Sequence, residues 1–118
     1  AELAKRYDVW LPMGYWSFRT AEHADPAFYT VDNVRRLRAD LADPAALVHA
    51  IGGVGAADGT AIVDPGEPLA SVDDLIPFVG ALLGEGAIGG SIYDWATMGV
   101  DARRRFGELM DGPFPVVN

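Results

Sequence analysis

Four aromatic residues and one acid lie where two apolar segments of the chain end, and together they could bind a sugar. Tyr15-Trp16 follows one apolar segment, and Tyr93-Asp94-Trp95 follows another. Aromatic rings offer apolar faces on which the C–H faces of sugars can stack, and a carboxylate can accept hydrogen bonds from sugar hydroxyls. Asp94 stands between two aromatics, so we predict that it orients a substrate or transfers a proton. An equally good interpretation makes Asp94 a turn or capping carboxylate.

Two polar residues in the loop after Trp16 could serve the same cleft. Arg19 and His23 could donate hydrogen bonds to sugar hydroxyls. His49 lies within an apolar segment, where a hydrogen-bonded core histidine is a more common role than a metal ligand. The chain has two histidines and no cysteine, so we expect neither a metal site nor a cofactor. The alternative for the aromatics is that they only pack over the core.

Strand-like and helix-like patterns alternate three times along the chain, which predicts an α/β fold with parallel strands. Apolar segments typical of buried strands cover residues 7–13, 46–51 and 88–93. Helical spacing follows each of them, from Thr30 to about Ala42, after Ser71, and from about Asp101. Ser71 has an acidic residue three positions later, as in a capping box. Pro77 and Gly80 interrupt the second pattern, so we expect a kink, or a tight turn before a regular helix from Ile76.

The loops that leave the first two strands are long, and those that return from the helices are short. Barrel enzymes share this asymmetry, because their sites use loops at the carboxyl ends of the strands. We therefore predict three consecutive βα units of a partial (β/α)8 barrel over the single segment 1–118. A small doubly wound sheet, with helices on both faces, is the alternative.

Three strands with helices on one side would leave an apolar face bare. We expect Val9, Leu11, Leu47, Ile88 and Ile92 on that face, and an exposed patch of that kind needs a partner. Residues 1–6 resemble the tail of a helix that is cut short. We therefore expect the segment to be the C-terminal portion of a barrel, with the remainder of the barrel, or another copy of the chain, as its partner.

The net charge of −8 makes nucleic acid and anionic membranes poor partners. No apolar run approaches the roughly 18 residues of a membrane span. Two arginine clusters, Arg35/Arg36/Arg38 and Arg103/Arg104/Arg105, fall in predicted helices. For both we expect solvated outer faces rather than binding patches.

The motifs MGYW, IGGVG and GGSIYDW resemble the last three strands of glycoside-hydrolase-like TIM barrels. The resemblance implies a carbohydrate-binding part of such a barrel, with an oligosaccharide or polysaccharide as ligand and a secreted or cell-envelope location. It assigns sugar binding to the aromatic strand ends, namely Tyr15, Trp16, Tyr93, Asp94 and Trp95. A glycosidase needs two carboxylates across the scissile bond, and the chain offers no convincing pair. The main catalytic acids would therefore lie outside this segment. The composition, rich in Ala, Gly, Asp and Arg, hints at a bacterial source.

Two other readings remain open. Gly52-Gly53-Val54 and Gly89-Gly90-Ser91 resemble the glycine-rich strand ends of a phosphate-binding barrel. Against that reading, a long stretch of chain separates Gly53 from the helix at Ser71, and the aromatics have no use in it. The third reading is a non-catalytic, self-associating binding module, which the lack of a carboxylate pair favours.

Overall fold

The computed structural model describes residues 2–53, 69–94 and 97–115, which form a mixed α/β fold with a small parallel sheet. Its strands are β1 (Val9–Trp10), β2 (Met13–Gly14), β3 (Leu47–Gly52) and β4 (Gly89–Ile92). β1, β2 and β4 all pair with β3 in the parallel direction. The predicted α/β class and parallel strands are therefore confirmed. A parallel sheet of this size occurs in both barrels and open sheets, so the partial barrel stays a prediction.

β1 and β2 are two pieces of one strand that Pro12 divides. Val9 pairs with Leu47 and Met13 with Ile51, so the register against β3 is unchanged across the interruption. The Pro12 carbonyl accepts a hydrogen bond from the Ile51 N–H at 2.9 Å. In a parallel ladder the same residue would also donate to that neighbour, but proline has no N–H. Pro12 therefore interrupts the strand without shifting its register against β3.

The first long helix, α1 (Pro26–Asp40), begins earlier than the sequence predicts. Its N-cap is Asp25, whose carboxylate accepts a hydrogen bond from the Phe28 N–H at 2.7 Å. Pro26 occupies the first helical position, where its missing N–H costs nothing. Thr30, the predicted helix start, is instead buried inside the helix and donates its hydroxyl to the Pro26 carbonyl at 2.7 Å. The helix start at Thr30 was therefore wrong.

The second helix begins as the capping pattern predicts. Ser71 and Asp74 form a capping box around the 3-10 turn η4 (Val72–Asp74). The α-helix α2 (Leu75–Gly84) follows directly, which confirms the tight turn expected before Ile76. The last helix is α3 (Val100–Met110). The shorter 3-10 turns are η1 (Leu3–Lys5), η2 (Trp16–Phe18) and η3 (Ala21–Ala24).

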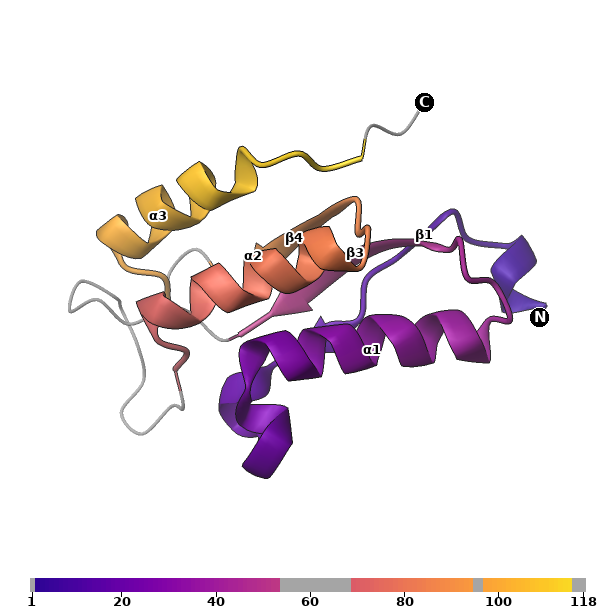
Figure 1. The fold of residues 1–118 in the computed structure, drawn as a ribbon, viewed down its shortest axis with the longest axis horizontal. Coiled ribbons are helices and arrows are strands. Elements are labelled where there is room, and N and C mark those ends of the chain that lie inside the picture. Colours follow the sequence, from indigo (N-terminus) through magenta and orange to yellow (C-terminus); the bar gives the residue numbers. More distant parts are fainter. Residues whose placement is uncertain (1, 54–68, 95–96, 116–118) are drawn as a thin grey trace.

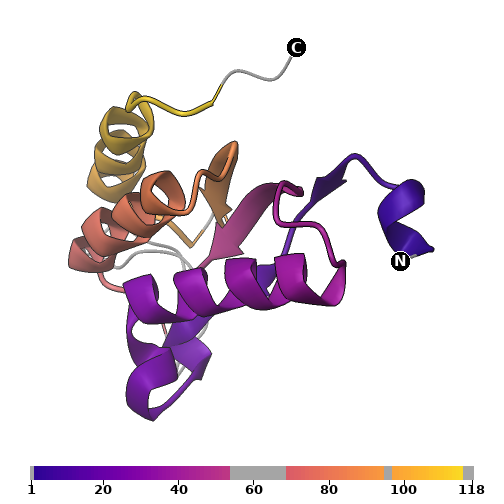
Figure 2. The same cartoon turned by 45° about the vertical axis from the view of Figure 1, so that its right-hand side comes forward.

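The described helices lie on one face of the sheet, as Figures 1 and 2 show. Along β3, burial alternates: Val48, Ala50 and Gly52 are buried, and the residues between them are only half-buried. We call the side of Val48 and Ala50 the covered face. We call the other side the open face, defined by the alternate residues Leu11, Met13, Leu47, His49, Ile51 and Ser91.

The core lies between the covered face and the helices. Val34 of α1, Leu75, Phe78 and Leu82 of α2, and Ala102 of α3 are fully buried there. Ile92, which we expected on the bare face, belongs to this core. The strand register explains the correction, because Ile92 pairs with Gly52 in the phase of the covered face.

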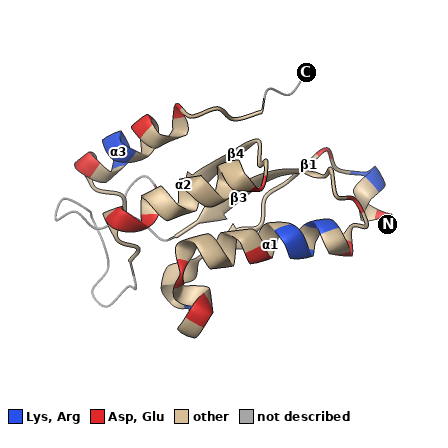
Figure 3. Ribbon diagram, viewed as in Figure 1, with Lys and Arg blue, Asp and Glu red and all other residues tan. Residues whose placement is uncertain are grey.

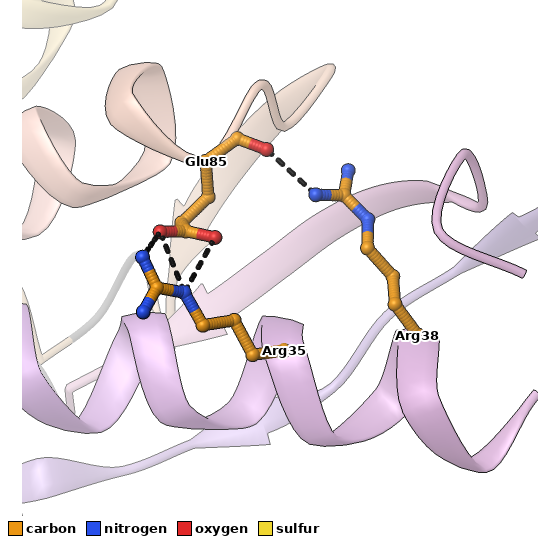
Figure 4. A network of polar contacts seen from close by, with 3 residues as sticks. All are labelled: Arg35, Arg38 and Glu85. Atoms are coloured by element: carbon orange, nitrogen blue, oxygen red, sulfur yellow. Dashed lines mark hydrogen bonds and ion pairs between the residues drawn. The ribbon is translucent and has the colours of Figure 1, made fainter.

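Arg35 and Arg38 join α1 to the end of α2 (Figure 4). Arg35 forms a bidentate contact with the Glu85 carboxylate, with the shortest N···O distance at 2.8 Å. The hydrogen bond to the Glu85 carboxylate and its negative charge raise the pKa of the Arg35 guanidinium above its ordinary value. Arg38 donates to the Glu85 carbonyl at 2.7 Å and to the Ala46 carbonyl at 3.2 Å. We predicted a solvated outer face for this arginine cluster, and that prediction was wrong for Arg38. Figure 3 shows the charged residues of the chain on its helices and turns.

Candidate functional site

The carboxyl ends of β2, β3 and β4 lie side by side. Met13 pairs with Ile51, and Ile51 pairs with Ser91 on its other side. Residues that follow these strands therefore leave the sheet at one edge, as a site at the carboxyl ends requires.

Two tyrosines meet at this edge. The ring centroids of Tyr15 and Tyr93 are 5.9 Å apart with the planes tilted by 44°, and Phe18 lies 6.5 Å from Tyr15. Tyr93 is 52% exposed and Tyr15 is half-buried. The Tyr15 hydroxyl donates to the Met13 sulfur at 3.2 Å, which fixes its ring beside the open face. We call Tyr15, Phe18 and Tyr93 the tyrosine edge.

Trp16 turns the other way and lies in the core. It is only 2% exposed, and its ring centroid is 5.1 Å from that of Phe78. Its indole Nε1 donates to the Asp74 carboxylate at 3.0 Å, so the buried N–H has a partner in the capping box. The alternative that these aromatics pack over the core therefore describes Trp16, whose ring has no free face for a ligand. Trp95 lies outside the described residues.

Asp94 is engaged in a local turn directly after Tyr93. Its Oδ1 accepts hydrogen bonds from the Thr97 N–H at 3.1 Å and from the Thr97 hydroxyl at 2.9 Å. The Asp94 N–H in turn donates to the Thr97 hydroxyl at 2.9 Å. These contacts match the turn role that the sequence left open. The half-buried carboxylate still lies next in the chain to the exposed Tyr93.

A histidine and a serine meet on the open face, and sequence reasoning missed their pairing. His49 Nε2 is 3.2 Å from the Ser91 hydroxyl on the neighbouring strand. Burial lowers the pKa of His49, because the charged imidazolium is poorly solvated there. The ring also lies over Gly89, where an added Cβ would be 3.1 Å from Nδ1. A hydrogen-bonded histidine was expected, but its partner depends on strand register, which the sequence does not state.

The glycine-rich strand ends accommodate side chains of this chain. A Cβ on Gly52 would lie 2.4 Å from the Trp16 ring and 2.6 Å from the Phe78 ring, and one on Gly90 would lie 2.3 Å from Leu82. Gly53 has a φ of +59° and lies under the same indole. Close packing therefore accounts for these glycines without a bound phosphate.

Arg19 and His23 lie together, in a second polar cluster at the start of α1. The Arg19 guanidinium lies over the Tyr29 ring at 5.5 Å, and the His23 ring contacts Tyr29 edge-on at 5.3 Å. Asp32 lies close to His23 and pairs with Arg36 one helical turn later. The i, i+4 spacing of Asp32 and Arg36 was the signal in the sequence that could have indicated this cluster.

Within the residues that the structure describes, no three histidine, cysteine or acidic side chains gather as a metal site would require. In the same part of the chain, no helix has the length and apolar character to cross a membrane. Comparison of the chain with protein-family models, curated proteins and solved structures finds no match.

Proposed function

We propose that the tyrosine edge binds carbohydrate, as the sugar-binding part of a glycoside-hydrolase-like barrel. The observation that carries the proposal is the exposed ring of Tyr93 beside Tyr15, at the edge where the parallel strands end. Exposed aromatic rings at this edge suit the apolar faces of sugar rings. Asp94 follows Tyr93 directly in the chain and would hydrogen bond to a sugar hydroxyl. Catalytic acids for hydrolysis would come from outside the segment, because one carboxylate cannot supply both roles.

The test compares two exposed tyrosines at opposite ends of the parallel sheet: Tyr7 precedes β1 and Tyr93 follows β4. Tyr93 is 52% exposed, and Tyr7 is 58% exposed and packs edge-on against Trp10. Calorimetric titration with neutral gluco-, xylo- and manno-oligosaccharides should show binding by the unmodified protein. Tyr93→Ala should weaken it about fivefold or more, the equivalent of about 1 kcal/mol for a lost stacking contact. Tyr7→Ala should bind as the unmodified protein does. Equal effects of both substitutions, or no binding of any sugar, would contradict the proposal.

A second candidate is a binding module that uses the whole open face. Met13 is 65% exposed and Leu11 is also exposed on this face, and its defining residues include no Asp, Glu, Lys or Arg in a chain of net charge −8. An apolar, uncharged surface is suited to another copy of the chain or to further strands of a barrel. A sedimentation coefficient that rises with protein concentration would support self-association.

A further inference from the structure

A second polar site lies beside the first turns of α1, apart from the tyrosine edge. It is a surface cavity of about 260 Å³, lined by Arg19, His23, Tyr29, Asp32, Asn33 and Arg36. Three of its contributing elements are the segment after η2, the turn η3 and α1. The lining thus comes from one continuous stretch of the chain, from Arg19 to Arg36, that folds back on itself.

Tyr29 organises the cavity. Its ring carries the Arg19 guanidinium at 5.5 Å and meets the His23 ring at an interplanar angle of 78°. Its backbone carbonyl accepts a hydrogen bond from Asn33 Nδ2 at 2.8 Å. A guanidinium that lies over an aromatic ring keeps its N–H groups free for other partners. Arg19 is therefore oriented by the ring while its donors stay available.

The charges of the cavity favour an anion. Asp32 is its one carboxylate, and its oxygens lie 3.0 Å from Arg36 Nε and 3.5 Å from His23 Nε2. In the described part of the chain, Arg19 has no carboxylate within ion-pair distance. Two guanidinium groups thus face one carboxylate, an excess of positive charge in a chain of net charge −8.

We propose that this cavity binds a small oxyanion, a carboxylate or a phosphate, with Arg19 as its main contact. Guanidinium groups form paired, charge-assisted hydrogen bonds with both kinds of anion. Asp32 pairs with Arg36 and lies close to His23, which leaves the Arg19 guanidinium to the ligand. The site does not depend on carbohydrate binding at the tyrosine edge.

Titration with inorganic phosphate and with acetate, at constant ionic strength set by chloride, tests the proposal. We expect saturable shifts of the Tyr29 and His23 ring resonances in NMR spectra. The anion with the lower dissociation constant shows whether the cavity prefers a phosphate or a carboxylate. Arg19→Gln should weaken binding at least about tenfold, as expected when a charge-assisted pair is lost.

The matched control is Arg104→Gln, which removes an exposed arginine of α3 that pairs with Asp101. It should leave the dissociation constant unchanged. Equal effects of the two substitutions would overturn the proposal, and so would shifts with phosphate and acetate no larger than with chloride alone.

Discussion

The two faces of the sheet share one backbone and differ in almost every other respect. On the covered face, Val48 and Ala50 belong to one cluster of buried apolar side chains with residues of α1 and α2. On the open face, the alternate residues of the same strand are half-buried, and Met13 and Leu11 are exposed. The tyrosine edge adjoins the open face, whereas Trp16 packs on the covered face. The covered face therefore holds the fold together, and the open face is available for recognition.

The largest expected difference between the faces comes from deleting one large side chain on each. Phe78 is fully buried, between Trp16 at 5.1 Å and Phe106 at 6.4 Å. Phe78→Ala should lower the free energy of unfolding by about 3–5 kcal/mol. Met13→Ala, on the open face, should cost less than about 1 kcal/mol. Urea denaturation followed by circular dichroism measures both, and similar losses would mean that the open face is covered as well.

Adding a single methyl group should give a smaller contrast. A Cβ on Gly52 would collide with the rings of Trp16 and Phe78, so Gly52→Ala should destabilise the fold by about 1–3 kcal/mol. Gly89→Ala faces only the His49 ring at 3.1 Å on the open face, where that ring can shift. Its effect on the thermal midpoint should be clearly smaller. A larger loss for Gly89→Ala would show that the open face is the tighter one.

The smallest effect concerns His49 on the open face, which makes the free energy of unfolding depend on pH. Burial lowers the pKa of His49 in the folded chain below its ordinary value of 6.5. The unfolded chain then binds the proton more readily, so the stabilising contribution is present above about pH 6.5 and is lost as the pH falls below it. Unfolding free energies measured at pH 7.5 and pH 5.5 should therefore differ less in His49→Gln than in the unmodified protein.

Ser91→Ala is the control for this measurement. It removes the hydroxyl at 3.2 Å but keeps the imidazole and its surroundings. The pH dependence should persist in this variant, because burial is the cause of the lowered pKa. If the free energy of unfolding depends on pH in the same way in the unmodified protein and in His49→Gln, His49 is not the source of that dependence.

Local patterns predicted the elements, and long-range packing decided what the sequence could not. The parallel direction of the strands follows from the alternation of strand and helix patterns, and the capping box at Ser71 follows from short-range spacing. The side to which Trp16 turns depends on space above Gly52, which belongs to a different strand. Asp25-Pro26 carried a helix-start signal as good as that of Thr30, and only the structure distinguishes them. Likewise, the Arg38 contact with Glu85 joins residues too far apart for a local pattern.

The position of Pro12 has a consequence for the outer edge of the sheet, which β1 and β2 form. Prolines often protect such edges by removing an outward-facing donor. The donor missing here faces β3, because the Pro12 carbonyl already bonds to Ile51. By alternation, Leu11 and Met13 direct their amide and carbonyl groups outward. Leu11 and Met13 therefore keep the main-chain orientation that an edge strand needs for pairing with a further strand.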